Sequence, residues 1–108
     1  MKFKKTLIAT VIAMAASTSL ANATKLTFYC SAQEDWCQSM ARGFEEATGI
    51  DVNMTRKSSG ETFAQIKAES SNPKGDVWWG GTGDPHLQAA EEGLTEPYVS
   101  SMRGELND

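Results

Sequence analysis

The chain has 108 residues, of which 14 are acidic and 10 are basic, so its formal net charge is −4. An acidic balance argues against binding to nucleic acids and to anionic membranes, because both are recognised by basic patches. The length allows one small hydrophobic core.

The N-terminal stretch over 1–23 has the pattern of a cleavable export signal. Three lysines open it, an apolar run over 6–16 follows, and Ala21-Asn22-Ala23 fits a signal-peptidase site. The run is shorter than the ~20 residues that a membrane-spanning helix needs. No cysteine stands at a lipid-attachment position after it. We therefore predict a signal peptide over 1–23, a periplasmic location and no membrane insertion of the mature chain, 24–108.

The mature chain alternates segments with strand and helix patterns. Strand patterns, rich in β-branched and aromatic residues or alternating in polarity, are found at 25–30, 50–55 and 76–79. Helix patterns follow at about 31–48, 59–70 and 84–93. This order, with short loops, predicts an α/β fold in which a parallel sheet carries helices on both faces.

Local capping patterns mark the expected helix starts. Ser31 with Glu34 and Ser58 with Glu61 each fit a capping box, in which the two side chains satisfy backbone donors at the helix start. Asp84-Pro85 fits an N-cap followed by proline at the first helical position.

Apolar residues at helical spacing are expected to face the core. They are Trp36, Met40 and Phe44, with Cys37 and Ala41 beside them, in the first helix, Phe63 and Ile66 in the second, and Leu87, Ala90 and Leu94 in the third. Trp78 and Trp79 are adjacent in a strand, so we expect them to point to opposite faces of the sheet and to pack under different helices.

Both cysteines, Cys30 and Cys37, lie in the part predicted to be exported. An oxidising compartment favours a disulfide between them, whereas a redox motif would have the C-x-x-C spacing and zinc would need more ligands. The predicted disulfide ties the end of the first strand to the first turns of the following helix.

Ligands of open α/β sheets bind outside the carboxyl ends of the strands. The loops at 31–34, 58–62 and 80–84 lie at such ends and are rich in small or hydroxylic residues. N–H groups at a helix start, together with the helix dipole, bind anions. The stretch 56–66 is the clearest candidate for an anion site, although its Ser58–Glu61 pattern also fits a plain helix cap.

Other polar residues are expected to have structural roles. The only histidine, His86, is expected at the surface near a helix start, and Glu61 is expected to serve the cap rather than a metal. Glu34 and Asp35 are adjacent and do not face each other on a helix, which favours a solvated face over acid–base catalysis. No catalytic-triad, nucleophile-elbow, phosphate-loop or His/Cys metal pattern is present. We predict a protein that is not an enzyme and has no cofactor.

The mature chain resembles the N-terminal lobe of type II solute-binding proteins of bacterial ABC importers, in the group labelled ferric-iron or phosphonate and sugar-phosphate binders. The resemblance is carried by the stretches 26–31, 44–52, 56–61 and 75–86. It implies a three-layer α/β lobe, incomplete here, because members have two lobes that close about a hinge and are several times longer. Residues 24–108 are thus expected to be the N-terminal part of the first lobe.

The resemblance also implies which residues contact the ligand. Carried onto this chain, they are Ser31, Gln33, Ser58, Ser59, Gly60, Thr62, Gly81 and Thr82. Ferric-binding members often have a histidine just after the first strand, and 30–34 contains none, so the resemblance favours a phosphorylated organic solute over a ferric ion.

The expected function is capture of a small anionic solute and its delivery to an ABC-transporter permease. Two alternatives stay open at this point. One is a ferric-iron-binding protein, and the other is an exported α/β hydrolase with catalytic residues beyond Asp108.

Overall fold

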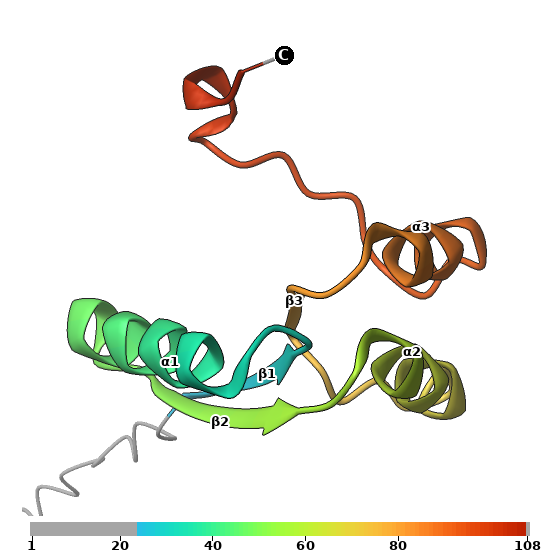
Figure 1. Cartoon of the computed structure of the whole chain (residues 1–108), viewed down its shortest axis with the longest axis horizontal. Helices are drawn as coiled ribbons and strands as arrows, with labels where there is room; N and C mark the ends of the chain where they lie inside the picture. Colours follow the sequence, from blue (N-terminus) through green and yellow to red (C-terminus); the bar gives the residue numbers. More distant parts are fainter. Residues whose placement is uncertain (1–23, 108) are drawn as a thin grey trace, which may run out of the picture.

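The computed structural model of the chain describes residues 24–107, and the predicted signal peptide over 1–23 lies outside this range. Strands and helices alternate along the described chain (Figure 1). The elements are β1 (Lys25–Cys30), α1 (Glu34–Thr48), β2 (Asp51–Arg56), α2 (Ser59–Ala68), β3 (Val77–Trp79), α3 (Gly83–Glu91) and the 3₁₀ turn η1 (Arg103–Glu105).

The described strands form one parallel sheet in the order β2-β1-β3. Cys30 at the end of β1 is in register with Arg56 of β2 and Trp79 of β3. The carboxyl ends of the strands therefore lie at the same edge of the sheet. The predicted α/β fold with a parallel sheet is confirmed.

Helices cover both faces of the sheet. Phe28 and Cys30 of β1 point toward α1 and form a buried cluster with its Cys37 and Ala41. Tyr29, which lies between them in the strand, points to the opposite face and hydrogen-bonds side chains of α2. The alternation along β1 thus places α1 on one face and α2 on the other.

The tryptophans of β3 point to opposite faces of the sheet, as predicted. Trp79 lies near Phe28 on the α1 face, with 6.5 Å between the ring centroids. Trp78 lies on the other face, where its ring stacks on His86 of α3. β3 therefore contacts α3 on one face, and on the other face its Trp79 lies beside Phe28 of β1.

The inward face of α1 differs from the prediction. Its buried residues are the small Cys37 and Ala41, whereas Trp36, Met40 and Phe44 are 57%, 50% and 37% exposed. The small side chains allow α1 to approach β1 closely, and the larger ones lie at the margin of this contact. The predicted apolar stripe is therefore wrong for Trp36, Met40 and Phe44 and confirmed for Cys37 and Ala41.

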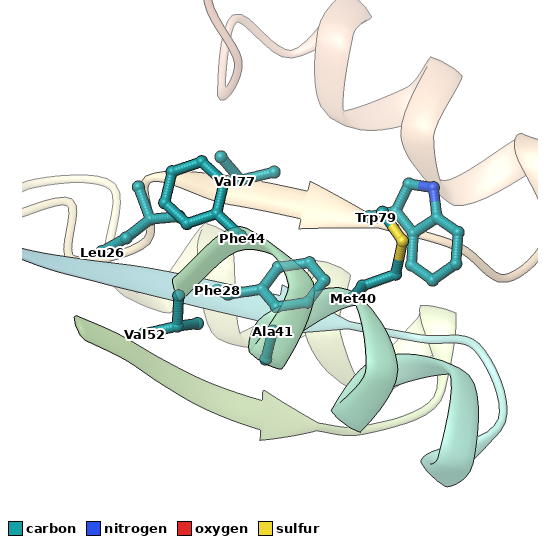
Figure 2. A pocket seen from close by; sticks show the side chains of 8 residues that line it. All are labelled: Leu26, Phe28, Met40, Ala41, Phe44, Val52, Val77 and Trp79. Atoms are coloured by element: carbon teal, nitrogen blue, oxygen red, sulfur yellow. The ribbon is translucent and has the colours of Figure 1, made fainter. Parts of the chain in front are cut away.

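An apolar groove lies between α1 and the sheet and measures about 220 Å³. Figure 2 shows its lining side chains, which come from the helix and from all the described strands. They are Leu26, Phe28, Met40, Ala41, Phe44, Val52, Val77 and Trp79.

The disulfide between Cys30 and Cys37 is present, with 5.8 Å between the Cα atoms. Both residues are fully buried. The bond joins the end of β1 to the first turns of α1, as predicted, and holds the loop between them.

α1 begins and ends by different means. At its C-terminus Gly49 adopts φ 71° and its N–H donates to the carbonyl of Glu45, as expected for a glycine cap. At its N-terminus the cap position is Gln33, and no side chain caps the helix. The predicted capping box of Ser31 with Glu34 is wrong, because the Ser31 hydroxyl is bonded elsewhere (see below).

α2 begins at its predicted N-cap, Ser58, whose Oγ accepts from the N–H of Glu61 at 3.3 Å, which is one of the two bonds of the predicted capping box. The start of α3 differs. Thr82 is its cap position, so Asp84 lies within the first turn and is not the N-cap. The predicted Asp84 cap is wrong by two positions.

The inward face of α3 also differs from the prediction. Ala89 is fully buried, whereas Leu87 is 65% exposed and Ala90 is exposed as well. α3 packs beside α2, and the ends of the two helices are joined by an ion pair of 3.1 Å between Lys67 and Glu92.

The segment after α3 leads away from the sheet to η1 (Figure 1). None of the helices described over 24–107 has the length and apolar character required to cross a membrane.

Candidate ligand-binding site

Three loops follow the carboxyl ends of the strands, and we call them the first corner (31–33), the second corner (57–62) and the third corner (80–83). Backbone hydrogen bonds continue the sheet into them. The N–H of Lys57 donates to the carbonyl of Cys30 at 3.1 Å, and the N–H of Ser31 donates to that of Trp79 at 2.8 Å. All the corners therefore lie on one rim of the sheet.

The third corner requires glycine. Gly80 and Gly81 have φ values of 84° and 86°, which other residues rarely adopt. A Cβ on Gly80 would lie 2.8 Å from the Cβ of Ala32, and one on Gly81 would overlap the hydroxyl of Ser59. The absence of side chains here lets the third corner touch both other corners.

A hydrogen bond locks the second corner to the third corner. The N–H of Thr82, at the cap position of α3, donates to Oγ of Ser59 at 3.0 Å. Ser59 is the first residue of α2, so the starts of α2 and α3 are held side by side. Two helix N-termini, each with a partial positive charge, thus meet at the rim.

Two of the predicted ligand residues lie beneath the rim surface. Ser31 is 8% exposed and Thr62 is 2% exposed. Their hydroxyls share a hydrogen bond of 3.2 Å, and Ser31 Oγ also accepts from Nε1 of Trp78 at 3.0 Å. The bond between these two hydroxyls therefore joins the first corner to the second corner beneath the surface of the rim.

The other predicted ligand residues are more accessible. Ser59 is half-buried, and the exposed ones are Gln33, Ser58, Gly60, Gly81 and Thr82. They come from all the corners, so the structure brings the predicted residues together at one rim.

The first turn of α2 offers backbone donors. The N–H of Glu61 is bonded to Ser58 Oγ, and the N–H of Thr62 is bonded to the Ser58 carbonyl at 2.9 Å. The N–H groups of Ser59 and Gly60 come before these and have no acceptor within the helix. The rim therefore presents amide donors at the positive end of a helix dipole, an arrangement that suits an anion.

Cationic side chains flank the rim. Arg56 ends β2, and its Nε donates to the carbonyl of Ala32 at 2.9 Å, which joins the second strand to the first corner. Lys57 follows it and is half-buried. Among residues 24–107, no group of His, Cys, Asp or Glu side chains is placed to hold a metal ion.

Sequence reasoning missed the role of Trp78 and His86. The half-buried His86 stacks on Trp78, with 3.7 Å between ring centroids and 24° between planes. Its Nε2 lies 2.9 Å from the carbonyl oxygen of Gly80. His86 is therefore not a plain surface residue. The alternation along β3 predicts on which face Trp78 lies, but the contact with His86 also requires the position of α3 over β3.

A polar cluster lies on the α2 face of the sheet, away from the rim. The hydroxyl of Tyr29 donates to Glu69 at 2.8 Å, and Gln65 donates to Glu69 at 2.9 Å. Burial raises the pKa of the Tyr29 phenol, and the bond to Glu69 raises it further. The bond from Gln65 holds the pKa of Glu69 below its usual value, with Tyr29 adding to this effect.

The Tyr29 cluster borders a hollow of about 1110 Å³ that also contacts α3 and the segment after it. Neither this hollow nor the apolar groove includes the exposed residues of the rim. The described chain therefore provides the rim as one surface rather than as an enclosed pocket.

Comparisons with known proteins place the chain among relatives of greater length. A profile of the family described as bacterial extracellular solute-binding protein matches residues 26–105. A Haemophilus influenzae protein, described as an uncharacterized protein, is 41% identical over 111 residues, which cover 98% of this chain and 32% of that protein.

Solved structures show the same fold. The periplasmic binding protein AfuA from Actinobacillus pleuropneumoniae, with exogenous fructose-6-phosphate bound, is 46% identical with a TM-score of 0.70, over 72% of this chain and 24% of that chain. Iron-bound HitA from Pseudomonas aeruginosa is 26% identical with a TM-score of 0.63, over 65% of this chain and 23% of that chain.

This chain thus spans between 23% and 32% of the length of these relatives. Because the family profile covers most of the chain and solved periplasmic binding proteins share its fold, the chain belongs to the bacterial extracellular solute-binding proteins, of the type II class found in ABC importers.

Proposed function

We propose that this chain is part of a periplasmic receptor that captures a small solute for an ABC importer. In this proposal residues 24–108 form the N-terminal part of the first lobe, and 1–23 are the signal that exports it. The rim is one wall of the binding site, and a second lobe outside this sequence supplies the other. The short share of the relatives' length that the chain covers supports this arrangement.

The solute that the rim suits best is a phosphorylated organic compound. The observation that carries this proposal is the pattern of bonds at the start of α2. Ser58 accepts from the N–H groups of Glu61 and Thr62, so the N–H groups of Ser59 and Gly60 stay available for a ligand. Such uncharged N–H donors bind phosphate oxygens without forming an ion pair. The 46% identity to a relative that holds fructose-6-phosphate also supports it.

A ferric ion is the second candidate, favoured by the similarity to iron-bound HitA. Iron would need anionic oxygen or histidine ligands, and Glu61 is the exposed carboxylate in the second corner. In that case most of the ligands would come from the second lobe.

The proposed mechanism is capture followed by closure. The amide donors of the rim hold the anion, the lobes close about a hinge, and the closed form is recognised by the permease. This role requires no bond breaking, so the protein is proposed not to be an enzyme. Turnover of a phosphate ester by the purified protein would instead favour the exported hydrolase.

Native mass spectrometry tests this proposal on the gene product purified from the periplasm of its own cells. We expect a bound species with the mass of a phosphorylated solute. Isothermal titration with fructose 6-phosphate, inorganic phosphate and ferric citrate then ranks the candidates. If ferric citrate binds tightly and neither fructose 6-phosphate nor inorganic phosphate does, the solute is iron and the phosphate proposal is wrong.

A variant of the second corner tests the donors directly. Gly60→Pro removes one proposed N–H donor at a first-turn position where helices tolerate proline. We expect affinity for fructose 6-phosphate to fall about tenfold or more, because one hydrogen bond to a charged group is worth about 1.5–3 kcal/mol. The matched control is Gly60→Ala, which keeps the N–H and whose Cβ meets no atom within 4 Å. Equal affinities of the two variants would contradict the proposed donor.

A further inference from the structure

His86 lies behind the rim and contacts the third corner from the α3 side. Its ring is held on one face by Trp78, at 3.7 Å between centroids. Its Nε2 lies 2.9 Å from the carbonyl oxygen of Gly80. A carbonyl only accepts hydrogen bonds, so Nε2 carries the proton and donates it.

This bond sets the direction of the next amide. The carbonyl of Gly80 and the N–H of Gly81 belong to one planar trans peptide and point in opposite directions. A side chain that holds the carbonyl on the α3 side therefore turns the Gly81 N–H away from α3. The exposed Gly81 is one of the predicted ligand residues, and its N–H then points out of the third corner.

The third corner needs such a constraint. Gly80 and Gly81 lack side chains that would limit their backbone, and both have positive φ values. The Thr82–Ser59 bond of 3.0 Å fixes the far end of the corner. The His86–Gly80 bond fixes the near end, so the peptide between them has one orientation.

Trp78 extends the constraint to the first corner. While its ring supports His86, its Nε1 donates to Ser31 Oγ at 3.0 Å, and Ser31 is bonded to Thr62. The orientation of the third corner is therefore set by contacts that also fix the other corners.

We propose that His86 is a positioning residue of the ligand site, which aims the Gly81 N–H at the bound anion through its hydrogen bond to Gly80. This inference rests on the proposed function. A donated bond to the carbonyl also polarises the peptide, which strengthens its N–H as a donor.

Paired variants separate the hydrogen bond from packing. His86→Phe keeps an aromatic ring for Trp78 and loses the donor, whereas His86→Gln keeps a donor. We expect His86→Phe to weaken binding of fructose 6-phosphate about three- to tenfold and His86→Gln to restore most of the affinity. Leu87→Ala, at the exposed neighbouring position, is the matched control and should bind like wild type. If His86→Phe is folded and binds as tightly as wild type, the inference is wrong.

Amide hydrogen exchange, measured without ligand, tests the role of His86 independently of the proposed function. The Thr82 N–H is bonded to Ser59, and we expect it to exchange faster in His86→Phe than in His86→Gln or Leu87→Ala. If wild type binds none of the probes, the proposed function fails while this readout still tests the corner. Equal Thr82 exchange in all these proteins would overturn the positioning role.

A measurement on wild type covers the case in which His86→Phe does not fold. Nitrogen NMR of His86 should show the proton on Nε2, as the bond to Gly80 requires. A neutral ring that carries its proton on Nδ1 would overturn the inference.

Discussion

Ser31 and Thr62 show how a residue of the predicted site can act beneath its surface. Sequence reasoning placed both hydroxyls toward a ligand and also placed Ser31 at a helix cap. In the structure the Ser31 hydroxyl is bonded to Trp78, 47 residues away, and to Thr62, 31 residues away. A local capping pattern does not contain such distant partners, whereas the Ser58 cap depends only on residues nearby and was predicted correctly.

The hydrogen bonds that Gln65 and Tyr29 donate to Glu69 make a pH-dependent contribution to stability. The folded pKa of Glu69 is lowered from 4.5, so its contribution is present above that pH and is lost as pH falls through the lowered pKa. Glu69→Gln removes the titrating group and keeps an acceptor for Tyr29. We expect the unfolding free energy of this variant to fall less between about pH 6 and about pH 3 than that of wild type. Urea unfolding at each pH measures the difference.

The matched control for this prediction removes the donors instead. In a background with Tyr29→Phe and Gln65→Ala, the bonds that lower the pKa of Glu69 are lost. Glu69→Gln should then change the acid sensitivity much less. An effect of the same size in both backgrounds would show that these bonds are not its cause.

At the scale of elements, the sequence predicted the strands better than the helix caps and the helix faces. β1 was predicted at its observed bounds, because its β-branched and aromatic residues are bordered by clear turn signals. The predicted face of α1 was too broad, since only Cys37 and Ala41 of it are buried, and the predicted face of α3 missed the buried Ala89. An amphipathic pattern marks a broad apolar face, but the row that lies closest to the sheet is set by which side chains are small enough.

The disulfide supports the junction of β1 and α1. Replacing Cys30 and Cys37 together by alanine should lower the unfolding free energy by about 2–3 kcal/mol, as expected for a loop of this length. The first corner lies within this loop, so we also expect faster amide exchange over 31–33. Reductant should destabilise wild type and leave the double variant unchanged. A double variant as stable as oxidised wild type would contradict this role.

At the scale of the whole molecule, the parallel sheet and its helices followed from the alternation of strand and helix patterns. The assembly of the corners also followed, because parallel strands bring their carboxyl ends to one edge. The contacts of His86 did not follow, since they require the crossing position of α3 over β3. In the proposed receptor, the identity of the solute also depends on a second lobe, which these residues do not specify.

The predicted signal peptide over 1–23 can be tested on the exported protein. Mass spectrometry of protein from the periplasm should give an N-terminus at Thr24, because Ala21-Asn22-Ala23 fits the cleavage site. Replacing Ala21 and Ala23 by leucine should leave an uncleaved precursor, because the peptidase requires small residues there. An intact Met1 in the periplasmic wild-type protein would contradict the predicted signal.

The Cys30–Cys37 bond has a consequence for how the protein matures. The chain contains only these two cysteines, and they are separated by seven positions. Within residues 24–108 only one intramolecular pairing is possible, so this part of the protein has no scrambled disulfide isomer of its own. Because the two cysteines are close in sequence, the bond can form from a short segment of chain, and in the proposed export route that segment is among the first parts of the mature chain to reach the periplasm.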